Sequence, residues 1–268
     1  MTAIFAYPGY PNIRVLDDWK PYRREVVRYL DLIATTFAGR TLFNFISRKS
    51  PRFVLIVPNK SPPINSITDP QNEPDAFTRG AAVTRIQMLP DGTPALNPDG
   101  SVTLVPTGAT GTGRGTNALL RYHPAMYRQL MANLQTILPG AGPGEALYHE
   151  LVHAMRMLHG MFLADAGPEH LFMDDFVEFC AIVAANMYRS ERGFKNLRLD
   201  HHGYSPMNPL MANSAEFFRI HESPLKRWFG SQRDFCSELA RSPAPFNPLW
   251  LAADDLGIAI PPSMTLIK

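Results

Sequence analysis

The sequence predicts an α+β protein with a small mixed or antiparallel sheet and a mainly helical C-terminal half. Short apolar runs rich in β-branched residues, ended by proline or glycine, lie in the first half of the chain, as strands require. Longer stretches with apolar residues at helical spacing dominate after residue 124. The chain has 268 residues, 45% of them apolar, so it can bury a substantial core. We therefore expect a single domain over residues 1–268.

The first expected element is a helix over residues 20–37. Val26, Leu30 and Ile33 recur on one face of it, and Gly39 supplies a stop. Residues 53–57 form a β-branched run closed by Pro58, which predicts a buried strand.

Residues 58–115 are expected to form a loop-rich insertion with hairpins. This segment holds nine of the 25 prolines and seven of the 18 glycines, interrupted by apolar runs such as residues 102–105. Its glycine-rich end, residues 107–115, lacks the spacing of a dinucleotide-binding loop and leads into an extended segment. A turn is therefore favoured over a phosphate-binding loop.

A strand at residues 117–122 is followed by three expected helices, at 125–138, 144–159 and 174–191. The proline- and glycine-rich residues 139–143 separate the first two helices, and Gly160 ends the second. Residues 206–268 are expected to form a helical tail.

Composition excludes several classes of function. The net charge of +2 comes from scattered residues without a basic stripe, so no nucleic-acid partner is expected. No stretch approaches roughly eighteen uninterrupted apolar residues, and the first residues lack the pattern of a Sec signal peptide. Two cysteines, Cys180 and Cys236, fit a reducing compartment. We expect no membrane contact, and a protein that is cytoplasmic in the producing cell or exported by a specialised secretion system.

The expected helix at 144–159 carries the motif His149-Glu150-Leu151-Val152-His153. Residues four apart on a helix lie about 40° apart around the axis and roughly 6 Å along it, so both imidazoles can reach one metal ion. Glu150 can then act as general base on a water at that ion. The pattern predicts a Zn²⁺ site with hydrolytic chemistry.

A catalytic zinc site has three protein ligands and one open position, so a third ligand is required. His159 stands where a metzincin would place it, but that pattern needs glycine where this chain has Arg156. On a continuous helix His159 would point about 240° away from His153 and lie roughly 9 Å farther along the axis. It could not bind the same ion.

Glu178 is the better candidate, because it is the only charged residue between Phe176 and Tyr188. An ionised carboxylate in such an apolar stretch is costly unless it is paired or bound to a metal. The alternatives are that Glu178 is exposed or pairs with an arginine such as Arg198. Asp174 and Asp175 are the reserve ligands.

Four segments carry a resemblance to a known family: residues 148–154, 178–183, 186–191 and 197–203. Together they resemble the NleD-like type III effector metallopeptidases and related bacterial toxin domains, and the glycine-rich turn with residues 117–122 is similar to the segment before that family's active-site helix. The resemblance covers roughly residues 107–205, which we take as the catalytic core, preceded by an N-terminal region at 1–106.

The resemblance implies a zincin-like fold, Zn²⁺ as cofactor and hydrolysis of a protein or peptide substrate in a host or competitor cell. His149 and His153 correspond to metal ligands, Glu150 to the catalytic base, and Glu178 to the third ligand of a gluzincin-like site. The long insertion at 58–115 departs from the family and leaves the substrate open. An extended substrate could pair with residues 117–122 if they form an edge strand over the cleft.

An oxyanion-stabilising side chain should complete such a site. Four residues after Glu178 are available, and the sequence does not rank them: Arg198, His201, His202 and Tyr204.

Two other functions compete with a zinc peptidase. The first is a non-proteolytic binding module in which the metal site is structural or vestigial. The second uses Cys180 as a nucleophile, which its apolar surroundings disfavour because they raise the pKa of the thiol.

Overall fold

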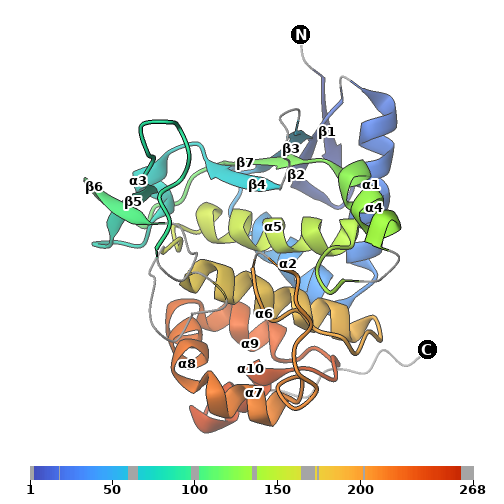
Figure 1. Ribbon diagram of the computed structural model, residues 1–268, viewed down its shortest axis with the longest axis vertical. Helices are drawn as coiled ribbons and strands as arrows, with labels where there is room; N and C mark the ends of the chain where they lie inside the picture. Colours follow the sequence, from blue (N-terminus) through green and yellow to red (C-terminus); the bar gives the residue numbers. More distant parts are fainter. Residues whose placement is uncertain are drawn as a thin grey trace.

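The computed structural model describes residues 3–17, 19–59, 66–97, 103–134, 138–163, 173, 175–201 and 203–260. It is an α+β structure built in layers (Figure 1). A sheet lies over helix α5 (Pro143–Leu158), α6 (Phe176–Glu191) lies on the other side of α5, and the last four helices pack beyond α6. The predicted α+β class is confirmed.

The main sheet is mixed and has the strand order β1-β2-β3-β7-β4. Its strands are β1 (Ile4–Tyr7), β2 (Tyr10–Leu16), β3 (Val54–Pro58), β7 (Ala118–Tyr122) and β4 (Ile67–Pro70). Strands β2, β3 and β7 run parallel to one another, while β1 and β4 are antiparallel to their neighbours. The predicted strands at 53–57 and 117–122 are thus found as neighbours.

The order of the strands corrects one expectation. Residues 117–122 do not form an edge strand, because β7 lies between β3 and β4. The edge is β4, which pairs with β7 in the register Thr68↔Leu120. Pro70 ends the strand, and nothing in the proline-rich sequence around it signals that this short segment would join the main sheet.

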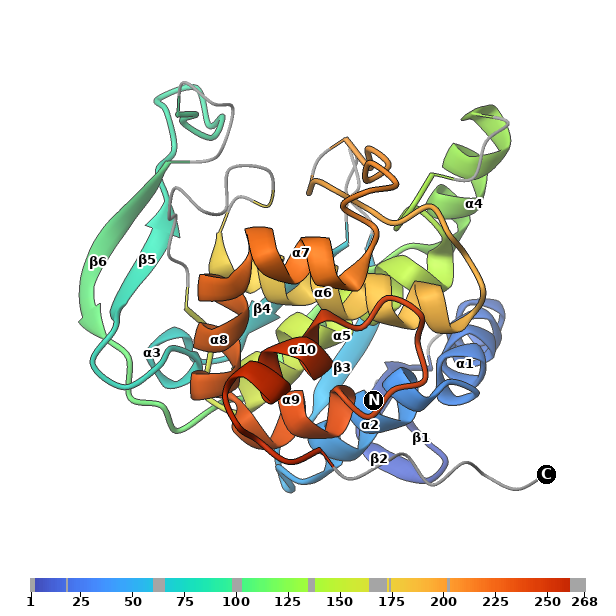
Figure 2. The same ribbon diagram turned by 90° about the horizontal axis from the view of Figure 1, so that it is seen from below.

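The remaining part of the predicted insertion leaves the main sheet. After the short helix α3 (Glu73–Ala76), strands β5 (Ala82–Ile86) and β6 (Leu104–Thr110) form a separate two-stranded arm at one side of the molecule (Figure 2). A hairpin was expected here, and the apolar run at 102–105 belongs in part to β6.

The helix predicted at 20–37 is two helices. They are α1 (Lys20–Ala34) and α2 (Phe37–Ser47), and Gly39 lies inside α2 instead of stopping the first helix. A Cβ atom at Gly39 would lie 1.9 Å from the carbonyl oxygen of Ile33, so glycine is needed where the two helices meet. The Thr36 side chain caps α2 by accepting a hydrogen bond from the Gly39 N–H at 2.9 Å.

The C-terminal half is helical, as predicted. The described helices there are α4 (Pro124–Leu134), α5, α6, α7 (Ser214–Ile220), α8 (Glu222–Ser231), α9 (Arg233–Leu239) and α10 (Pro248–Asp255). No helix in the described parts of the chain is both long and apolar enough to cross a membrane. The end of the tail, from residue 261, lies outside the described residues.

Candidate metal centre

The candidate site is formed by α5 and α6 where they pack against each other. Almost every residue of α5 is buried, since the sheet covers one side of it and α6 the other. Glu178 lies in the first turn of α6, which begins after Asp175. The Asp175 carboxylate caps that helix by accepting hydrogen bonds from the backbone N–H groups of Val177 and Glu178, both at 2.8 Å.

The structure brings the side chains of His149, His153 and Glu178 together. The two Nε2 atoms of the histidines are 3.0 Å apart. Glu178 Oε2 is 3.1 Å from His149 Nε2, and Glu178 Oε1 is 3.2 Å from His153 Nε2. Their potential ligand atoms all lie within 4.8 Å of one another, so the three residues could hold a metal ion.

The distances between the ligand atoms suit a metal ion with tetrahedral coordination. Zinc bonds of about 2.0–2.1 Å to nitrogen and oxygen place two ligand atoms of a tetrahedron about 3.3–3.4 Å apart. The observed separations are slightly shorter, and both imidazoles are only 5% exposed. The Nδ1 atom of each ring is buried without a hydrogen-bond partner in the described structure. Buried polar groups left in this state are rare, and a metal ion held by the Nε2 atoms would leave the Nδ1 atoms as they are. The feature that marks the candidate site is the approach of the two Nε2 atoms to 3.0 Å.

The pKa values of the three cluster residues are consistent with a site that binds a cation. Burial lowers the pKa of His149 to about 3, against the attraction of the Glu178 carboxylate. Burial has the same effect on His153, but the carboxylates of Glu178 and Glu150 outweigh it and raise its pKa to about 9. Burial opposes ionisation of Glu178, yet His153 and His201 hold its pKa well below the usual range. One positive charge thus accompanies the Glu178 carboxylate, and a metal ion would take the place of that proton.

Glu150 lies beside the cluster and is held from the edge strand. Thr68 Oγ1 on β4 donates a hydrogen bond to Glu150 Oε2 at 2.7 Å and lies 3.2 Å from the Glu150 carbonyl oxygen. Burial raises the pKa of Glu150, the direction that suits a group that must accept a proton. Thr68 was missed by the sequence analysis, and no periodicity or motif around it would have revealed it.

The rejected candidates have other roles. His159 ends α5, and its Nε2 lies 2.9 Å from the carbonyl oxygen of Phe45, away from the cluster. Arg156, in the position of the metzincin glycine, is fully buried and donates to Gln232 and to the Met161 carbonyl oxygen. Cys180 is buried, and this burial raises its pKa to about 12, which is unfavourable for a nucleophile.

Of the two reserve ligands, Asp175 is not part of the cluster. Asp175 caps α6, and burial together with the Glu178 charge raises its pKa to about 7. Asp174 lies outside the described residues.

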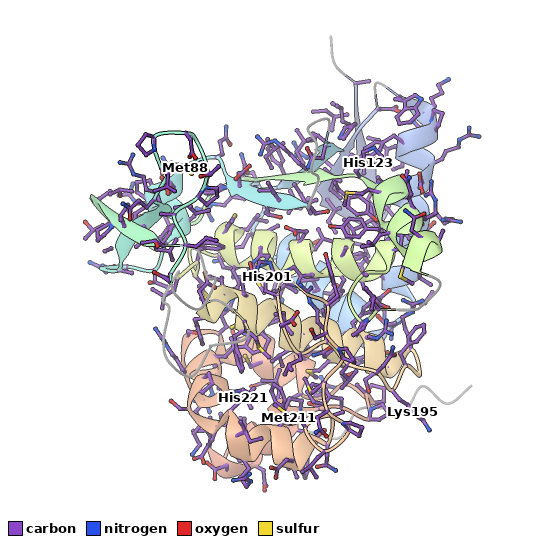
Figure 3. The ribbon with its side chains drawn as sticks, in the orientation of Figure 1. Met88, His123, Lys195, His201, Met211 and His221 are labelled. Atoms are coloured by element: carbon purple, nitrogen blue, oxygen red, sulfur yellow. The ribbon has the colours of Figure 1, made fainter. Side chains whose placement is uncertain are left out.

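A loop at residues 197–207 adjoins the cluster. His201 Nε2 is 3.4 Å from Glu178 Oε2, and its ring stacks at 6.0 Å from that of His149; Figure 3 shows it near the middle of the molecule. Arg198 does not pair with Glu178 but donates to backbone oxygens of its own loop. His202 lies outside the described residues.

A small polar pocket of about 50 Å³ opens beside His149 and Glu150. Its other lining residues come from α5, the segment before it, α4, the start of β4 and the loop: Ser66, Tyr127, Gly140, Ala146, Arg198, His201 and Tyr204. A larger groove of about 1630 Å³ lies between residues 193–197 and α10. The three candidate ligands and Glu150 do not line this groove. The chemistry on α5 and α6 therefore belongs with the smaller pocket.

Comparisons of the chain with protein-family models, curated proteins and solved structures found no match.

Proposed function

We propose that this chain is a zinc-dependent metallopeptidase of the gluzincin kind, with a zincin-like catalytic core. His149, His153 and Glu178 would hold the zinc, and Glu150 would be the general base. The observation that supports this proposal best is the convergence of two buried imidazoles and the half-buried Glu178 carboxylate, with contacts of 3.0–3.2 Å between their ligand atoms and a second carboxylate one residue after the first histidine. A role as effector or toxin, acting on a protein of a host or competitor cell, is supported by the resemblance of residues 107–205.

The number of ligands favours catalysis over a structural metal site. Structural zinc sites are closed by four protein ligands, whereas catalytic sites have three and an open position. Among the described residues, three meet the geometric requirement, and a polar pocket lies beside them. This supports an enzyme over the alternative of a non-proteolytic binding module.

When bound, zinc supplies a Lewis acid that polarises the carbonyl group of the substrate and lowers the pKa of a water molecule. Glu150 takes the proton of the attacking water and later passes it to the leaving amine. Thr68 engages one oxygen of the Glu150 carboxylate and so orients the other oxygen for this transfer. An extended substrate pairing with β4, the edge strand among the described parts of the sheet, would run beside Glu150, as recognition by strand addition requires.

The test is Glu150→Gln, assayed with a synthetic library of randomised peptides and mass spectrometry. We expect one zinc per chain in both proteins and a loss of hydrolysis of about 10²–10⁴-fold or more in the variant, since that is the usual contribution of a general base. Zinc is measured by atomic emission. Hydrolysis that survives in Glu150→Gln would contradict the mechanism, and a wild-type protein that binds zinc without cleaving any peptide would favour the binding module.

A further inference from the structure

The loop at residues 197–207 is held rigidly against α6. Asn186 of α6 is buried, accepts a hydrogen bond from the Arg198 N–H and donates one to the Arg198 carbonyl oxygen, both at 2.8 Å. Two backbone hydrogen bonds close the loop, from Leu199 to Ser205 at 2.9 Å and from Met207 to Leu197 at 2.6 Å. The loop is thus anchored two helical turns beyond Glu178.

The Arg198 side chain stabilises the conformation of this loop. Its guanidinium donates to the carbonyl oxygens of Asp200, at 2.6 Å, and His201, and it lies 4.5 Å from the centre of the Tyr204 ring. The side chain also fits closely over Gly140, where a Cβ atom would lie 2.6 Å from Arg198 Cδ. Arg198 is therefore occupied in shaping the loop and is a poor candidate for contact with a substrate.

The other polar groups near the pocket have roles as well. His201 Nε2 lies 3.4 Å from Glu178 Oε2 and is thus engaged with that carboxylate. The Tyr127 hydroxyl is hydrogen-bonded to Ser66 Oγ at 2.9 Å and accepts from the Ser66 N–H at 3.0 Å. Of the oxyanion candidates that the structure describes, Tyr204 is the one whose donor is not committed to the loop or the cluster.

Tyr204 has an unusual backbone conformation. It is the only residue other than glycine with a positive φ in the described parts of the chain, at 51°. A bulky residue in this region is strained, and such strain persists only where the surroundings enforce it, often at functional sites. Arg198 packs on the Tyr204 ring, which lines the same pocket as His149 and Glu150. The Tyr127 hydroxyl donates a hydrogen bond to the Tyr204 phenol oxygen, a contact that lowers the pKa of Tyr204 against the larger effect of burial and leaves its own O–H to donate elsewhere.

We propose that Tyr204 is a catalytic residue that donates its phenolic hydrogen bond to the carbonyl oxygen of the scissile peptide bond, an inference that rests on the proposed peptidase function. Burial raises the pKa of Tyr204, so the hydroxyl remains a donor at neutral pH. A preorganised donor of this kind stabilises negative charge as it develops, and its strained, rigid placement provides the preorganisation.

The bonds and protons balance as follows. The water oxygen bonds to the carbonyl carbon, the π electron pair moves to the carbonyl oxygen, and the water proton goes to Glu150. Tyr204 keeps its proton throughout and shares it in a hydrogen bond with that oxygen. The carbonyl then re-forms, the C–N bond breaks, and Glu150 returns the proton to the amine.

The experiment uses the library peptide that the wild-type protein cleaves fastest. Tyr204→Phe keeps the ring under Arg198 and removes the hydroxyl alone. We expect kcat to fall by roughly 10²–10³-fold, as for other single oxyanion donors. KM should change by less than about threefold, and one zinc per chain should remain.

A binding measurement separates the transition state from the ground state. A phosphinic analogue of the same peptide, which mimics the tetrahedral oxyanion, should bind Tyr204→Phe more weakly by a factor similar to the loss in kcat. The uncleaved peptide should bind Glu150→Gln and Glu150→Gln/Tyr204→Phe equally well. Tyr188→Phe, which removes a buried phenol of α6 outside the site, is the matched control and should leave kcat unchanged.

Two results would overturn the assignment of Tyr204 while leaving the peptidase intact. One is Glu150-dependent cleavage that Tyr204→Phe preserves within threefold, and the other is loss of zinc from Tyr204→Phe, which would show a structural role. Absence of any Glu150-dependent cleavage would instead refute the proposed function, and the role of Tyr204 with it.

Discussion

Helices α5 and α6 share two buried polar clusters that differ in how well their hydrogen bonds are satisfied. At one end, Glu145 of α5 pairs with Arg189 of α6, and both are at least 95% buried. The second oxygen of Glu145 accepts from the Gly140 N–H at 2.8 Å, and Arg189 also donates to the backbone and side-chain oxygens of Asn196. At the other end, the Nδ1 atoms of His149 and His153 have no hydrogen-bond partner among the described residues.

The difference separates a structural ion pair from the candidate metal site. A buried charge pair contributes to a fold only when its geometry is good and its remaining hydrogen bonds are made. The Glu145–Arg189 pair meets that condition. The histidine cluster instead brings nitrogen and oxygen atoms together at distances suited to a cation, and leaves polar atoms unsatisfied. We therefore expect changes at the pair to affect stability and changes at the cluster to affect zinc binding.

The largest expected effect is on stability, from Arg189→Ala. The substitution leaves the buried Glu145 carboxylate with Arg192 as its remaining cation, 3.9 Å away, and we expect the free energy of unfolding to fall by about 3–5 kcal/mol. Urea unfolding of chelator-treated protein measures it without a contribution from metal. The double variant Glu145→Gln/Arg189→Met keeps an acceptor for Gly140 and should recover most of the loss. A loss below about 1 kcal/mol for Arg189→Ala would contradict the view that the Glu145–Arg189 pair stabilises the fold.

The second effect concerns zinc affinity, tested by Glu178→Gln. Zinc binding to four-ligand sites is worth about 10–16 kcal/mol, so one ligand contributes on the order of 3 kcal/mol, or about a hundredfold in Kd. Competition with a chromophoric chelator should show that weakening. The unfolding free energy of the zinc-free protein should also fall, because the Glu178 carboxylate accompanies the protonated His153 there, so zinc affinity is the measurement that tests Glu178 as a ligand. Unchanged zinc affinity would exclude Glu178 as a ligand.

The smallest expected effect concerns His159, the third histidine near α5. Like the Glu145–Arg189 pair it has a hydrogen-bond partner, the carbonyl oxygen of Phe45. Burial lowers its pKa from 6.5 to about 4. The unfolded chain therefore takes up the proton first as the pH falls, so this stabilisation is complete above about pH 6.5 and declines toward pH 4. In His159→Gln that part of the pH dependence should disappear, which amounts to about 2 kcal/mol between pH 7 and 4.5.

The measurement for His159 is the difference in unfolding free energy between the two chelator-treated proteins across that pH range. The other titrating groups cancel in this difference. Zinc affinity at neutral pH is the control and should equal that of wild type. A difference that does not vary with pH would mean that the folded protein accepts the His159 proton as readily as the unfolded chain.

Local spacing was sufficient to predict much of the site. The i, i+4 positions of His149 and His153 place both rings on one face of any α-helix, because the helical repeat is the same wherever the helix lies. Glu178 could be selected because a single charge in an apolar stretch of α6 must face a partner once that stretch is buried. The same local rules located the strands β3 and β7 and the helices after residue 124.

The tertiary structure decided what depends on contacts distant in the chain. Thr68 reaches Glu150 across 82 residues, and β4 becomes the edge of the sheet only through its pairing with β7. The division of the first helix at Thr35 and Thr36 likewise depends on the close approach at Gly39. The proposal of Tyr204 among the three described candidates rests on the contacts by which Arg198 and Asn186 hold its loop, with a positive φ at Tyr204. Such contacts leave no periodic trace in the sequence, since they arise only when packing brings separate elements together.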